Sequence, residues 1–159
     1  MELHLKIIGF ILVLLSVVHL IFPKYFNWKQ ELSSLNLINK QLMYVHTFFV
    51  ALMVLLMGIL CIYCSADLVH TTLGKQLSFG LFIFWGCRLF FQFFVYSPLL
   101  WRGKAFETVV HIAFSLLWIY LSVVFFTIYY TNSLIAFVTC CPILGRLFRT
   151  QISTNFYWF

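Results

Sequence analysis

The chain has 159 residues, of which 64% are hydrophobic and 9% are charged, and its mean hydropathy is +1.02. Soluble domains carry about 25% charged residues, so 10 Lys and Arg with 4 Asp and Glu cannot cover a surface in water. The composition excludes a soluble globular protein and predicts an integral membrane protein with the lipid bilayer as its partner. The basic residues lie between apolar runs rather than in one patch, so we expect no nucleic-acid partner despite the formal charge of +6.

Four apolar runs have the length of a membrane-crossing helix, for which about 20 residues are needed. They predict an all-α, four-helix transmembrane bundle with helices at about residues 5–22, 42–63, 77–96 and 109–130. The first run is slightly short, and we expect Lys6 to extend its reach and Pro23 to close it. The residues after it lack the cleavage pattern of a signal peptide, so this run is expected to remain as a helix.

The end of the chain is expected to differ from the four-helix domain. Residues 1–132 make up that domain, and residues 133–159 form a hydrophobic tail with an aromatic C-terminus. We expect the pair Thr131 and Asn132 to end the fourth helix. The apolar run after this pair is too short to span a membrane with certainty, so it is re-entrant, interfacial or a fifth crossing.

The loops indicate an orientation and a location. Five Lys and Arg residues fall in the expected loops at 23–41 and 97–108, and two, Lys6 and Lys75, fall on the opposite side. By the positive-inside rule the two loops face the cytoplasm, and for a bacterial chain the location would be the cell (inner) membrane. Apolar and charged residues alternate at helical spacing in the first loop, which predicts a short amphipathic helix on the membrane surface.

Ionisable side chains inside the expected spans are the main functional signal, because each costs at least a few kcal/mol in hydrocarbon. His19, His46 and His111 all lie roughly 3 to 6 Å along their helices from the same membrane face. Arg88 lies deeper in the third span, with Gln92 one turn further on. We therefore predict a polar chamber at one end of the bundle.

This chamber has the chemistry of a cofactor site. Imidazole is a common ligand of transition metals and haem, so His19, His46 and His111 are the candidate metal ligands. Arg88, Gln92 and Glu107 are the candidate cofactor-binding residues. Arg88 suits a haem propionate, a quinone oxygen or a carboxylate, and Glu107 could accept the ring N–H of His111. The leading hypothesis is a haem-binding or metal-binding protein with a redox or cofactor-handling role; whether it is an enzyme stays open.

Several alternatives remain. Interfacial histidines often only form hydrogen bonds with neighbouring groups. A carrier for a small solute, a proton or copper is a second hypothesis, the copper version resting on soft ligands that share one face of the second span: Met43, His46, Met53, Met57, Cys61 and Cys64. The pair Cys61 and Cys64 resembles, in position only, the redox cysteines of four-helix thiol oxidases. A third hypothesis is an accessory subunit, or a homo- or hetero-oligomer, that packs through Phe-rich helix faces.

Overall fold

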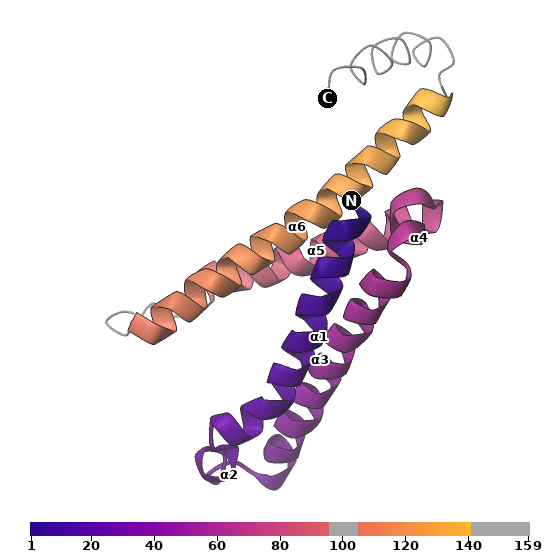
Figure 1. Ribbon diagram of the computed structural model, residues 1–159. Coiled ribbons are helices and arrows are strands. Elements are labelled where there is room, and N and C mark those ends of the chain that lie inside the picture. Colours follow the sequence, from indigo (N-terminus) through magenta and orange to yellow (C-terminus); the bar gives the residue numbers. More distant parts are fainter. Residues whose placement is uncertain (96–104, 141–159) are drawn as a thin grey trace. The chain divides into compact units, whose positions relative to one another are not determined.

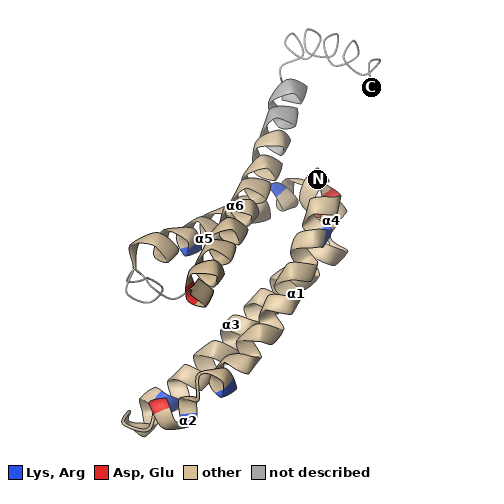
Figure 2. Ribbon diagram, turned by 60° about the vertical axis from the view of Figure 1, so that its left-hand side comes forward, with Lys and Arg blue, Asp and Glu red and all other residues tan. Residues whose placement is uncertain are grey.

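The described part of the chain, residues 1–95 and 105–140, consists of helices joined by short connections (Figure 1). In this computed structural model the helices are α1 (Glu2–Tyr25), α2 (Trp28–Glu31), α3 (Leu37–Tyr63), α4 (Ser65–His70), α5 (Thr72–Phe94) and α6 (Ala105–Cys140). Four of them, α1, α3, α5 and α6, are long and apolar enough to cross a membrane. The predicted all-α membrane fold is confirmed, and the protein is a multi-pass integral membrane protein. Most of its charged residues lie toward helix ends (Figure 2).

Two helices end later in the chain than predicted. Helix α1 passes through Pro23 and ends at Tyr25, because a proline in the last turn removes only one helical hydrogen bond. Helix α6 continues through Thr131 and Asn132 to Cys140, so the predicted break at this pair is wrong. The hydroxyl of Ser133 donates to the carbonyl oxygen of Tyr129 at 2.8 Å, which satisfies this polar side chain inside the helix. The predicted domain boundary at 132 lies within α6, and the rest of the predicted tail, 141–159, lies outside the described residues.

The helices form two compact units, each built on a pair of long helices. The first unit, Met1–Ala66, contains α1 packed on α3, and the second, from Asp67 onward, contains α5 packed on α6 (Figures 1 and 2). The short helix predicted between the first two spans is α2, which has four residues. It follows Asn27, whose φ of 47° lies in the left-handed region that asparagine tolerates. Its Trp28 packs edge-on against Tyr44 of α3, at 5.4 Å between ring centroids.

Two glycines set the close approach of α1 and α3. A Cβ atom added to Gly58 would lie 2.9 Å from the carbonyl oxygen of Gly9, and one added to Gly9 would lie 2.7 Å from the carbonyl oxygen of Gly58. Both distances are shorter than real carbon–oxygen contacts allow. Lipid provides no hydrophobic force between helices, so close packing of small residues is what holds such a pair together.

The start of α5 is fixed by a side-chain cap. Thr71 accepts a hydrogen bond from the backbone N–H of Gly74 at 2.9 Å and donates its own to the carbonyl oxygen of Asp67 at 2.7 Å. The first of these satisfies one of the backbone donors left open at a helix N-terminus. Gly74 is buried against the backbone of Asp67 and Leu68. Thr71 and Gly74 therefore join α4 to the first turn of α5.

We expect Gly58→Ala to destabilise the first unit by about 1 to 3 kcal/mol, the usual cost of overpacking a tight interface. Gly80→Ala is the matched control, because a Cβ atom at Gly80 meets nothing within 4 Å and alanine favours the helix. The measurement is the free energy of unfolding of each purified variant in mixed micelles. Equal effects of the two substitutions would contradict the assigned role of Gly58.

Candidate functional site

Polar side chains of α5 and α6 meet along one interface inside the second unit. The two helices are antiparallel, and contacts between them occur in order from one end to the other: Gln92 with His111, Trp85 with Trp118, Phe82 with Phe126 and Phe79 with Tyr129. Spacings of three and four residues place a row of polar or N–H-bearing side chains on the facing sides of the helices. We call this row the polar seam: Ser78, Trp85, Arg88 and Gln92 of α5, and His111, Ser115, Trp118 and Ser122 of α6.

Arg88 is the charged member of the polar seam. It lies six residues before the end of α5, which is about 9 Å along the helix axis, and it is half-buried. Its Nη1 donates to Oε1 of Gln92 at 3.2 Å, and its guanidinium carbon lies 5.1 Å from the centroid of the Trp118 ring. Gln92 is itself buried. The guanidinium is thus oriented by a hydrogen bond along α5 and by a cation–π contact to α6.

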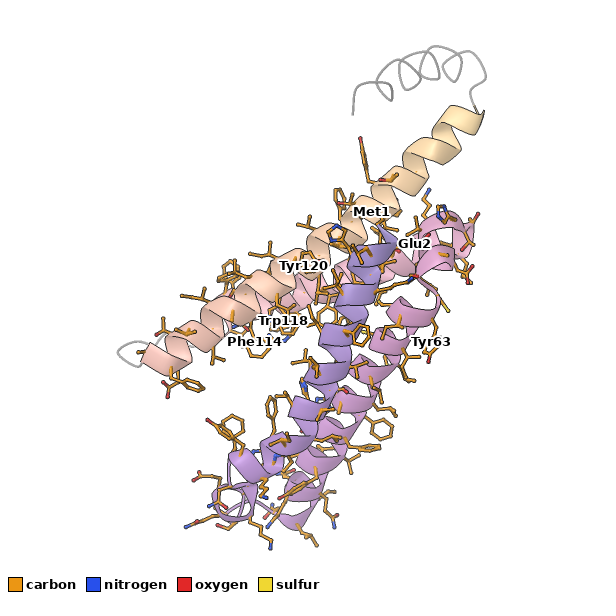
Figure 3. The ribbon with its side chains drawn as sticks, in the orientation of Figure 1. Met1, Glu2, Tyr63, Phe114, Trp118 and Tyr120 are labelled. Atoms are coloured by element: carbon orange, nitrogen blue, oxygen red, sulfur yellow. The ribbon has the colours of Figure 1, made fainter. Side chains whose placement is uncertain are left out.

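Aromatic stacking holds the two helices together beside Arg88. The rings of Trp85 and Trp118 are nearly parallel, at 11° and 5.0 Å between centroids, and Phe114 stacks on Trp118 at 5.6 Å. Phe114 and Trp118 extend from the same flank of α6 (Figure 3). Trp85 and Trp118 are 2% and 3% exposed. Large buried rings in an offset stack stabilise packing beyond what their buried area contributes. Trp118, which contacts Arg88, is therefore held in place by stacking against Trp85 and Phe114.

Four buried polar atoms of the polar seam have no hydrogen-bond partner among the described residues. They are Nε1 of Trp85, Nε1 of Trp118, Oγ of Ser78 and Oγ of Ser122. Each such atom costs about 1 to 3 kcal/mol relative to its state in water. The hydroxyl of Ser115, in contrast, donates to the carbonyl oxygen of His111 at 2.8 Å. The two indole N–H groups can only donate, so only a hydrogen-bond acceptor can satisfy them.

His111 belongs to the polar seam and lies beside Gln92. Its Nε2 lies 3.4 Å from the carbonyl oxygen of Gln92, and its ring meets Phe93 edge-on at 6.2 Å. A carbonyl oxygen only accepts, so Nε2 carries the proton in this contact. Glu107, one turn earlier on α6, is exposed. The structure therefore brings together Arg88, Gln92 and His111 of the predicted site residues.

The other two predicted ligands belong to the first unit. His19 is half-buried on α1, its Nδ1 donates to the carbonyl oxygen of Leu15 at 2.8 Å, and its ring lies 4.9 Å from that of Phe22. His46 is exposed on α3. Their grouping with His111 in one chamber stays a prediction. Within the described residues, no group of three or more His, Cys, Asp or Glu side chains is placed to hold a metal ion.

Of the sulfur-containing residues of α3, Cys61 lies on the buried face of the helix, and the exposed methionines do not. The buried face of α3 consists of Ala51, Val54, Gly58 and Cys61. Met43 and Met53 are exposed, at 41% and 50%, so they lie away from this face. Cys61 is buried and Cys64 half-buried, and both are free thiols. The path of soft ligands that a copper carrier needs is therefore not formed between α1 and α3.

Sequence reasoning missed the importance of the indole N–H groups. Trp85 and Trp118 fall at helical spacing from Arg88 and Ser115, which identifies them as members of inward-facing stripes. The pattern did not indicate that they stack on each other or that their N–H groups lack an acceptor. Ser78 was missed altogether, since a serine at the start of an apolar run is ordinary.

We expect Gln92→Leu to lower the free energy of unfolding of the second unit by about 1 to 3 kcal/mol, because Arg88 loses the buried acceptor Oε1. Gln76→Leu is the matched control, since Gln76 lies on the same helix and is exposed. A double-mutant cycle with Arg88→Met isolates the interaction between the two side chains. A coupling energy of zero would contradict the assigned role of Gln92.

In comparisons with known proteins, no protein-family model, curated protein or solved structure matches the chain.

Proposed function

We propose that this membrane protein binds an anionic amphiphile through Arg88 in the polar seam. The observation that carries the proposal is the guanidinium held inside a membrane-crossing helix pair by Gln92 and Trp118. An arginine keeps its charge at every accessible pH, and the attraction between opposite charges grows as the dielectric constant falls. An anion is therefore the ligand that such a position favours most.

The surroundings of Arg88 favour a ligand with an apolar chain. Arg88 and His111 are half-buried, so each keeps part of its surface accessible. Phe90 and Phe91 of α5 are 54% and 51% exposed, and in a bilayer these rings contact lipid chains. A small inorganic anion would have to leave water to reach this depth, whereas an amphiphile can enter with its chain in the hydrocarbon.

Oleate binding by the purified protein tests this proposal. We expect Arg88→Gln to weaken oleate binding at least tenfold, because a charge-assisted hydrogen bond contributes about 1.5 to 3 kcal/mol. Lys75→Gln is the matched control, since Lys75 lies on the same helix and makes a similar contact, 5.5 Å from the centroid of Tyr129. Affinities are measured by isothermal titration in uncharged detergent, with oleyl alcohol as the neutral probe. Equal binding of oleate by wild type and Arg88→Gln would contradict the proposal.

A second candidate function is the binding of haem or a transition metal by His19, His46 and His111, and one observation favours it. Because Nδ1 of His19 donates to a backbone carbonyl oxygen, its Nε2 carries the lone pair in the neutral ring. This is the usual state of a histidine that ligates a metal.

An absorbance spectrum and a metal analysis of the purified protein test this second candidate. Bound haem gives a Soret band, and a bound metal gives a stoichiometric metal content. We expect either signal to fall to background in His19→Ala and in His46→Ala, while His70→Ala, at an exposed position on α4, retains it. Absence of both signals in the wild type would contradict metal and haem binding.

A further inference from the structure

We infer that the anionic group bound at Arg88 is an oxoanion that also accepts hydrogen bonds from the indole N–H groups of Trp85 and Trp118. This inference rests on the proposed function and specifies its ligand. The class is an amphiphile with a carboxylate or a phosphate, the chemistry shared by fatty acids and phospholipid headgroups.

The three donor side chains lie together in the polar seam. The guanidinium carbon of Arg88 lies 5.1 Å from the centroid of the Trp118 ring, and the centroid of the Trp85 ring lies 5.0 Å from that of Trp118. The two rings come from different helices, so an oxoanion that accepts from both N–H groups would bridge α5 and α6.

The lack of an acceptor for either indole N–H indicates a ligand rather than simple packing. Both side chains are more than nine-tenths buried, and neither Nε1 atom has a partner among the described residues. Two stacked phenylalanines would fill the same space without leaving a polar atom unsatisfied. Tryptophan at both positions is therefore explained by an acceptor that arrives with the ligand.

An oxoanion is the group that satisfies these three donors together. A carboxylate has two oxygens with about four lone-pair sites, and a phosphate has more, so either can accept from a guanidinium and from two N–H groups at once. A single neutral carbonyl oxygen has two lone pairs, which are too few for this set, and a halide has no apolar chain with which to enter the hydrocarbon. The hydroxyls of Ser78 and Ser122, also without partners among the described residues, lie further along the polar seam, past the two tryptophans from Arg88.

Substitution of tryptophan by phenylalanine tests the inference, because it removes the N–H and keeps an aromatic ring. We expect Trp85→Phe and Trp118→Phe each to weaken binding of oleate and of dodecyl phosphate about tenfold, with no change for oleyl alcohol. Trp28→Phe, in the first unit, is the matched control and should bind like wild type. Dodecanoate and dodecyl phosphate have the same chain length, so tighter binding of dodecyl phosphate identifies a phospholipid headgroup as the source, and tighter binding of dodecanoate identifies a fatty acid.

A measurement on the wild type keeps the test independent of how the variants fold. Of the five tryptophan indole N–H signals in an NMR spectrum, the two from Trp85 and Trp118 should shift downfield on addition of oleate. Unmoved signals, with Trp85→Phe and Trp118→Phe binding oleate like wild type, would overturn the inference while the loss in Arg88→Gln still supports the proposed function. Failure of wild type to bind either anionic probe would overturn both.

Discussion

The hydrocarbon core of a membrane offers no hydrogen-bond partner, so polar groups inside it depend on the protein itself. In the helices the backbone N–H and carbonyl groups bond to one another, and several polar side chains also bond to the backbone. The hydroxyls of Ser16 and Ser115 each donate to a carbonyl oxygen of the preceding turn of their own helix. The polar seam departs from the rule, because Trp85 and Trp118 keep unpartnered donors beside a charged group. This departure distinguishes the α5–α6 pair from the rest of the described chain.

The two helix pairs pack by different means. In the first unit Gly9 and Gly58 bring two backbones into direct contact. These two residues have no side chain that could bind a ligand. In the second unit the stacked rings of Trp85 and Trp118 form the contact between the helices beside Arg88. These aromatic side chains also carry N–H donors. A charged group can be placed between such helices, whereas it would be excluded between backbones in contact.

A feature could be predicted from the sequence where residues close together in the chain determine it, and could not where it depends on how helices pair. Apolar length predicts the four long helices, and helical spacing places Arg88 and Gln92 on one stripe, since both are local properties. The contact of Gly9 with Gly58 depends on how two helices pair, which no local pattern specifies. The predicted end of the fourth helix was wrong because Thr131 and Asn132 were treated as helix breakers, although polar residues can continue a helix. The grouping of His19 and His46 with Arg88 depends on the placement of two units and stays a prediction.

The proposed ligand binding would be coupled to stability at the polar seam. The unpartnered N–H groups of Trp85 and Trp118 lower the stability of the helix pair in the absence of an acceptor. A ligand that supplies the acceptor binds the folded pair and not the separated helices, so it raises stability in proportion to the logarithm of its concentration. The same groups that make the pair less stable alone therefore increase its preference for a ligand. Replacing them with apolar rings would give a more stable pair with less affinity for the ligand, which is the trade-off expected of a binding site rather than of a structural core.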